Sequence, residues 1–213
     1  MITGLIIILP LYTITFVIAE ILYRKGYAVK TTRKIVHIGA GAVSFFLPLL
    51  VNLQIAVTIG VLFVCLLYWT EKRRLLESVH KIGNKNFGAI LFPIGLIVCA
   101  LIFWNINPLI FQSSALIVGL SDGLAGVFGQ KFGKREYNFT GRKTLEGSFL
   151  FFIITCGILL LTVLFYKDTI GLPKIFLIAL GSLGLTIVEG LFGKGWDNLF
   201  IPIFAGLTIY LIL

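Results

Sequence analysis

Long apolar runs separated by short polar segments make up most of this chain. Each run holds 16 to 21 residues. At 1.5 Å of rise per residue, a helix of that length approaches or spans the roughly 30 Å hydrocarbon core of a bilayer. Strand-like alternation is absent, and lipid cannot satisfy free backbone groups, so we expect every run to be helical. The runs are residues 4–23, 35–51, 53–70, 87–104, 108–128, 146–166, 173–191 and 198–213. The pattern predicts an all-α, polytopic membrane bundle of about eight transmembrane helices.

Composition agrees with a membrane protein and limits what else the chain can contain. The 213 residues are 58% hydrophobic, with a mean hydropathy of +1.03. A soluble domain of this size would expose too much apolar surface. Polar stretches reach only about twenty residues, so residues 1–213 are expected to form a single transmembrane domain. The net charge of +9 is better explained by basic loops that face anionic headgroups than by a nucleic-acid partner.

The basic residues are distributed unevenly between the two sides of the predicted bundle. The loops after the first, third, fifth and seventh runs carry 16 of the 18 lysines and arginines. Arg33 and Lys34 belong to the first of these loops, just before the run 35–51. Positive charge is retained on the cytoplasmic side of membrane proteins. We therefore expect these four loops in the cytoplasm and both termini outside.

Four carboxylates lie close to the predicted cytoplasmic ends of different runs. They are Asp122, Glu146, Glu189 and Asp197. A charged side chain at membrane depth costs roughly 2.5–3.5 kcal/mol on insertion scales, and is rarely present without a function. Because these acids share one membrane level with most of the basic residues, we interpret them as parts of one site at the cytoplasmic interface.

The segment 121–148 combines the chemistry that a metal–polyphosphate ligand requires. Carboxylates can hold Mg²⁺, cations can neutralise phosphates, and glycines let the backbone approach. Besides Asp122 and Glu146, the segment contains Gly129, Lys131, Gly133, Lys134, Arg142, Lys143 and Thr144. An alternative is that the glycines only pack helices and the basic residues only mark topology. That alternative leaves Asp122 unexplained. Motifs of soluble nucleotide-binding folds are absent.

Two further polar groups lie near the same level. Arg33-Lys34-x-x-His37 stands at the entrance to the run 35–51, and Asp197-Asn198 stands at the start of the last run. The alternative interpretations are structural: His37 as a hydrogen-bonding residue, and Asp197-Asn198 as a helix cap.

These residues resemble the CTP-dependent polyprenol kinases, a family that includes dolichol kinase, phytol kinase and yeast-type diacylglycerol kinase and is related to phosphatidate cytidylyltransferases. The resemblance covers roughly residues 33–206. The C-terminal H-G-G-x-x-D-R-x-D signature of the cytidylyltransferases is absent, and the last motif is similar to the kinase branch. The matching motifs are Arg33-Lys34-x-x-His37, Asp122-x-x-Ala125-x-x-x-Gly129-x-x-x-Gly133-Lys134, Lys143-Thr144-x-Glu146-Gly147-Ser148 and Val188-Glu189…Asp197-Asn198-x-x-x-Pro202.

The resemblance implies transfer of the γ-phosphate of CTP to the hydroxyl of a membrane alcohol, an isoprenoid such as phytol, geranylgeraniol or a polyprenol. Asp122, Glu146 and Glu189 would hold Mg²⁺. Asp122, Glu189, Asp197, Asn198 and His37 would form the catalytic set, with Asp197 orienting or deprotonating the hydroxyl. The nucleotide would contact Gly129, Lys131, Gly133, Lys134, Arg142, Lys143, Thr144, Arg33 and Lys34. Two alternatives remain open: a cytidylyltransferase that makes a CDP-lipid, and a non-enzymatic transporter, for which an intramembrane acid is also typical.

Overall fold

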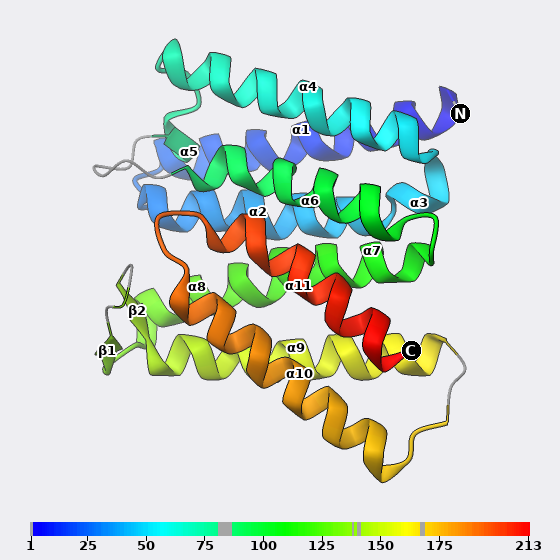
Figure 1. The fold of residues 1–213 in the computed structure, drawn as a ribbon. Helices are drawn as coiled ribbons and strands as arrows, with labels where there is room; N and C mark the ends of the chain where they lie inside the picture. Colours follow the sequence, from blue (N-terminus) through cyan, green and yellow to red (C-terminus); the bar gives the residue numbers. More distant parts are fainter. Residues whose placement is uncertain (1, 81–86, 138, 140–141, 167–168) are drawn as a thin grey trace.

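The computed structural model describes residues 2–80, 87–137, 139, 142–166 and 169–213. Nearly all of them are helical. The long helices lie side by side, and both termini are at the same end of the bundle (Figure 1). The opposite end holds α5, the two short strands and the connection from α10 to α11. The elements are α1 (Ile2–Arg24), α2 (Val29–Phe45), α3 (Leu47–Leu50), α4 (Leu53–Lys72), α5 (Glu77–His80), α6 (Gly88–Phe103), α7 (Pro108–Leu116), the π-helical segment η1 (Ile117–Ser121), α8 (Asp122–Phe132), β1 (Glu136–Tyr137), β2 (Lys143–Thr144), α9 (Leu145–Phe165), α10 (Leu172–Leu191) and α11 (Asp197–Ile212).

The predicted fold class, an all-α membrane bundle, is confirmed. Five helices are long and apolar enough to cross a bilayer: α1, α4, the continuous α7–η1–α8 segment, α9 and α10. Helices α6 and α11 are apolar but have only 16 residues each. Helix α2 has 17 residues, three of which are basic. The number eight therefore stays a prediction.

The expected bounds of the second run, 35–51, are wrong. Helix α2 begins at Val29 and ends at Phe45, and a separate short helix, α3, follows. Pro48 explains the break, because it has no N–H to donate to the carbonyl of Ser44 one turn earlier. The early start has a larger consequence. Arg33 and Lys34 lie on the helix itself, not in the preceding loop, so the bundle carries them inward.

Several polar side chains lie inside the bundle with its apolar core, and many large apolar side chains face outward. Ile6 and Phe176, for example, are 66% and 67% exposed. Ser113 and Thr162 are buried and join α7 to α9 through a hydroxyl–hydroxyl hydrogen bond of 2.7 Å. Between helices in lipid, packing and hydrogen bonds replace the hydrophobic effect. This distribution is the one expected of a bundle whose outer surface meets lipid.

Helix α2 and segment η1 cross in backbone contact. A Cβ added to Gly119 would lie 2.7 Å from Cα of Gly41, and one added to Gly41 would lie 2.5 Å from Cα of Gly119. Such small–small contacts allow transmembrane helices to approach closely. The π-helical turn sits directly before Asp122, and π-turns inside helices occur frequently at functional sites. This crossing therefore sets the distance from α2 to the first predicted site carboxylate.

We expect Gly119→Ala to destabilise the protein, because its methyl group would force α2 and η1 apart. Overpacking of this kind typically costs about 1–3 kcal/mol. The matched control is Gly157→Ala, since Gly157 is also helical and a Cβ there meets nothing within 4 Å. Thermal unfolding in detergent should show a lower midpoint for Gly119→Ala and an unchanged or higher midpoint for Gly157→Ala. Equal midpoints would show that the crossing tolerates a side chain.

Candidate functional site

Charged side chains are buried at the end of the bundle where α2, α8, β2, α10 and α11 meet. Arg33, Asp122, Glu189 and Asp197 are each less than a tenth exposed. Buried charges are stable only when opposite charges and hydrogen bonds compensate them. The structure supplies that compensation with two lysines.

Lys143 on β2 joins α10 to α11. Its Nζ donates to Oε1 of Glu189 at 2.6 Å and to Oδ2 of Asp197 at 3.1 Å, and also to the backbone carbonyl of Glu189. Burial by itself lowers the pKa of Lys143, but Asp197, Glu189 and Asp122 together hold it well above its usual range. The side chain therefore stays cationic, with two carboxylates on one ammonium group.

Lys34 on α2 pairs with Asp122 on α8. The Nζ–Oδ2 distance is 2.5 Å. The lysine stem lies across Gly126, because a Cβ added to that glycine would come within 2.6 Å of Cε of Lys34. Asp122 also interacts electrostatically with Lys143, and Glu189 with Asp122 and Asp197. The two lysine pairs thus belong to one cluster.

Arg33, His37 and Asn198 border this cluster. Arg33 interacts electrostatically with Asp197 and Asp122. His37 is 3% exposed and its ring packs 4.4 Å from that of Phe92, centroid to centroid. Asn198 donates from Nδ2 to the backbone carbonyl of Gly88 at 2.9 Å. Among the described residues, neither Nε2 of His37 nor Oδ1 of Asn198 makes a hydrogen bond of full geometry. The two side chains nevertheless lie within hydrogen-bonding reach of each other.

The predicted glycines and threonine of segment 121–148 pack against one another. A Cβ added to Gly129 would lie 2.6 Å from Oγ1 of Thr144, and one added to Gly147 would lie 3.0 Å from the same atom. Thr144 caps α9 by accepting the N–H of Gly147 at 3.2 Å. Gly133 also packs on Thr144. The contacts thus give these residues the packing role that the sequence left open, and their binding of a nucleotide stays a prediction.

Four other predicted residues lie at the edge of the cluster. Lys131 and Lys134 are exposed. Arg142 pairs with Glu136 across the β-hairpin at 2.9 Å. Glu146 accepts the backbone N–H of Arg135 at 3.4 Å. Lys131, Lys134 and Arg142 are thus exposed cations on the same segment of chain as the largely buried Lys143.

The structure does not gather Asp122, Glu146 and Glu189 into one metal site. Within the described part of the chain, no three His, Cys, Asp or Glu side chains lie close enough to hold an ion together. Mg²⁺ in nucleotide sites usually takes only one or two carboxylates and completes its shell with phosphate oxygens and water. Asp122, Glu189 and Asp197 have the oxygen chemistry for that arrangement, so magnesium stays a prediction.

Sequence reasoning assigned no role to Tyr137 and Ser148, which support Glu189. Ser148 donates to Oε2 of Glu189 at 3.1 Å, and the hydroxyls of Tyr137 and Ser148 are 2.6 Å apart. Burial raises the pKa of Tyr137. Both oxygens of Glu189 are therefore held, one by Lys143 and one by Ser148. Ser148 lies one turn into α9, close in the chain to Lys143 and Thr144. That position in the sequence was the only sign that it could take part in the site.

The proteins to which this chain is similar include phytol kinases of a cyanobacterium and of plants. No protein-family model and no solved structure matches it. It is 30% identical over 200 residues to a phytol kinase of Synechocystis sp. (strain ATCC 27184 / PCC 6803 / Kazusa), which covers 90% of this chain and 84% of that protein.

Two plant proteins match over a smaller part. The chain is 28% identical over 148 residues to the chloroplastic phytol kinase 1 of Arabidopsis thaliana, and 30% identical over 153 residues to a probable chloroplastic phytol kinase 1 of Oryza sativa subsp. japonica. It spans 48% and 47% of their lengths. On the near full-length match to the cyanobacterial protein, the chain belongs to the phytol kinase family.

Proposed function

We propose that this protein is a CTP-dependent lipid kinase that transfers the γ-phosphate of CTP to the hydroxyl of an isoprenoid alcohol of the phytol, geranylgeraniol or polyprenol type. Membership in the phytol kinase family supports a phosphotransferase with an alcohol acceptor. The observation that carries the proposal is the buried cluster in which Lys143 holds Glu189 and Asp197 beside the Lys34–Asp122 pair.

The phosphate side of the reaction needs cations in fixed positions. Phosphoryl transfer is catalysed mainly by positioning and by neutralising charge on the phosphate oxygens. Lys34 and Lys143 offer buried, pre-positioned ammonium groups, and Lys131, Lys134 and Arg142 offer exposed ones beside them. Bound Mg²⁺, held by Asp122 and Glu189 with Glu146 nearby, would neutralise further phosphate charge. The lysines would then turn part of their hydrogen bonding from carboxylates to phosphates.

The acceptor side needs a base next to a place for the hydroxyl. In the proposed step the alcohol oxygen bonds to the γ-phosphorus, the bond from that phosphorus to the β–γ bridging oxygen breaks, and CDP leaves. Asp197 accepts the hydroxyl proton. One of its oxygens contacts Lys143 and the other accepts the backbone N–H of Asn198 at 3.1 Å, so the carboxylate is held in a fixed orientation.

The proposed site faces the cytoplasm. The cluster lies at the end of the bundle away from both termini (Figure 1), next to the loops that carry most of the basic residues. The positive-inside rule assigns that end to the cytoplasm, where a soluble nucleotide would be available.

Purified protein with γ-labelled CTP, Mg²⁺ and a panel of lipid alcohols should place the label in an organic-extractable phospholipid. The same panel with labelled ATP tests the choice of donor. Label released as pyrophosphate, with phosphatidate as the lipid, would identify a cytidylyltransferase instead. If the protein is folded but turns over no nucleotide, the kinase proposal is wrong and the non-enzymatic transporter becomes the better interpretation.

We expect Asp122→Asn to lower kcat at least a hundredfold, on the order of the loss seen when one preorganised electrostatic group is removed. The variant should still insert and fold, because asparagine is nearly isosteric, but its unfolding midpoint should be lower, because Lys34 loses its buried carboxylate partner. Glu71→Gln, an exposed acid on α4, is the matched control and should keep full activity. Wild-type turnover in Asp122→Asn would remove this carboxylate from the mechanism.

Lys143→Met should lose both stability and activity, because it leaves Glu189 and Asp197 buried without their cation. Breaking a buried ion pair from one side typically costs about 3–5 kcal/mol. Adding Glu189→Gln should recover part of the unfolding midpoint without recovering turnover. A double variant as unstable as Lys143→Met would mean that the lysine acts through contacts other than these charges.

A further inference from the structure

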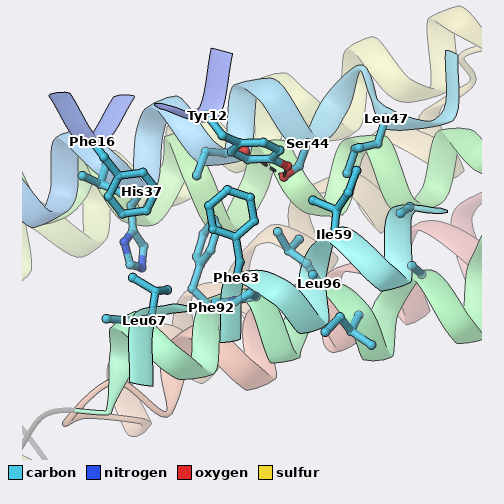
Figure 2. A pocket seen from close by; sticks show the side chains of 18 of the residues that line it. Tyr12, Phe16, His37, Ser44, Leu47, Ile59, Phe63, Leu67, Phe92 and Leu96 are labelled. Carbon is cyan, nitrogen blue, oxygen red and sulfur yellow. Dashed lines mark hydrogen bonds between the residues drawn. The ribbon is translucent and has the colours of Figure 1, made fainter. Parts of the chain in front are cut away.

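A narrow apolar cavity begins beside the charged cluster and runs along α2. Its volume is about 70 Å³ and its walls come mainly from α1, α2, α4 and α6. His37 lies toward one end of the cavity and Leu47 toward the other, as Figure 2 shows. Arg33, one turn before His37 on α2, also lines the cavity. Arg33 and Ser44, both in the lining, are eleven residues apart on one helix, about 16 Å of rise at 1.5 Å per residue.

A larger groove of about 750 Å³ lies between α1 and α4. Phe16, Ile59 and Phe63 line both spaces and therefore lie between the cavity and the groove. In the described part of the chain, α1 packs mainly on α2, and α4 mainly on α6. Helices α1 and α4 meet through aromatic side chains, because the ring of Phe63 lies 4.9 Å from that of Tyr12 and 6.0 Å from that of Phe16. The other groove residues include Leu9, Leu62 and Leu66. The groove therefore opens toward lipid.

The cavity has one polar end, lined by Arg33 and His37, and Asn198, which does not itself line the cavity, lies next to His37. Nε2 of His37 and Oδ1 of Asn198 are buried, and neither makes a hydrogen bond of full geometry to a described residue, although the two side chains lie within hydrogen-bonding reach of each other. Buried polar atoms without partners are uncommon and call for an explanation. A hydroxyl group can accept a hydrogen bond from an imidazole N–H and donate one to an amide oxygen at the same time. One alcohol group placed between them would satisfy both atoms.

We propose that the acceptor alcohol binds with its hydroxyl between His37 and Asn198, its first isoprenoid units in the cavity, and the rest of its chain leaving through the α1–α4 groove. This inference rests on the proposed function and specifies how the substrate is held. The cavity alone, at about 70 Å³, is much smaller than a long isoprenoid chain, so the chain needs the groove. Phe16 and Phe63 are the side chains that it must displace. The hydroxyl end then lies next to Asp197.

The path of the chain can be tested without turnover. An isoprenoid alcohol with a photoreactive diazirine near the far end of its chain, irradiated with the wild-type protein in nanodiscs, should label residues of α1 and α4 that line the groove. Excess unlabelled geranylgeraniol should suppress this labelling. Labelling confined to α9 or α10 would overturn the proposed path, whatever the kinase assay shows.

Phe63→Trp should narrow the passage between cavity and groove. We expect the KM for geranylgeraniol to rise on the order of tenfold, with the KM for CTP unchanged and a smaller effect on the short alcohol geraniol. Phe176→Trp on α10, which lines neither space and is 67% exposed, should change nothing. If Phe63→Trp matches the wild type with both alcohols, the path is wrong, while wild-type turnover keeps the kinase assignment intact.

His37→Ala should raise the KM for the alcohol roughly three- to tenfold, the range expected for one hydrogen bond, and leave the KM for CTP unchanged. His80→Ala, which removes the other histidine of the chain, is the control and should resemble the wild type. A His37→Ala variant whose KM rises for CTP and not for the alcohol would place His37 on the nucleotide side and overturn its assignment here.

Discussion

The bundle depends on the compensation of charges that it buries at one end. Glu189 and Asp197 come from different helices, α10 and α11, and share the ammonium group of Lys143 on β2. Removing any one of these groups from water is unfavourable, and only their mutual contacts make the arrangement stable. The same contacts align α9, α10 and α11, because Ser148 of α9 also holds Glu189. Lys143, Glu189 and Asp197, the charged groups that a ligand would contact, are therefore also the groups that join α9, α10 and α11.

Small residues make this burial geometrically possible. Gly41 and Gly119 let α2 touch the backbone of η1, and Gly126 leaves the space through which Lys34 reaches Asp122. A methyl group at any of these points would collide with a neighbouring backbone or with the lysine stem. Gly129 and Gly133, which the sequence suggested for phosphate binding, likewise allow a close approach, because both pack on Thr144.

The parts of the fold that sequence could predict are those that depend on composition along a single helix. Asp122 and Glu189 lie in apolar runs and Asp197 directly precedes one, which favours their burial. The structure brings these three acids together around Lys34 and Lys143, whereas Glu146, expected at the same site, lies at its edge. The predicted start of α2 was wrong because basic residues were assigned to the loop. In the structure, carboxylates of other helices compensate the charges of Arg33 and Lys34, so both residues can lie on the helix. Two further features depend on contacts between segments, which hydrophobic periodicity does not predict. They are the π-helical turn before Asp122 and the pair of hydrogen bonds by which Lys143 and Ser148 hold the two oxygens of Glu189.

The end face of the bundle and the apolar cavity lie on different sides of the cluster, one suited to a water-soluble reactant and the other to a lipid. The end face offers exposed cations, and the cavity behind it is mostly apolar, with its charged end at Arg33 and with the hydroxyls of Tyr12 and Ser44 hydrogen-bonded to each other. A water-soluble phosphate donor and a lipid acceptor cannot share one approach, because each is poorly solvated in the other's medium. Asp197 and Asn198 are adjacent in the chain, yet Asp197 contacts the charged cluster and Asn198 lies beside His37. In the proposed reaction, the first turn of α11 is therefore where the two approaches would meet, and a hydroxyl arriving from the membrane side would lie next to Asp197.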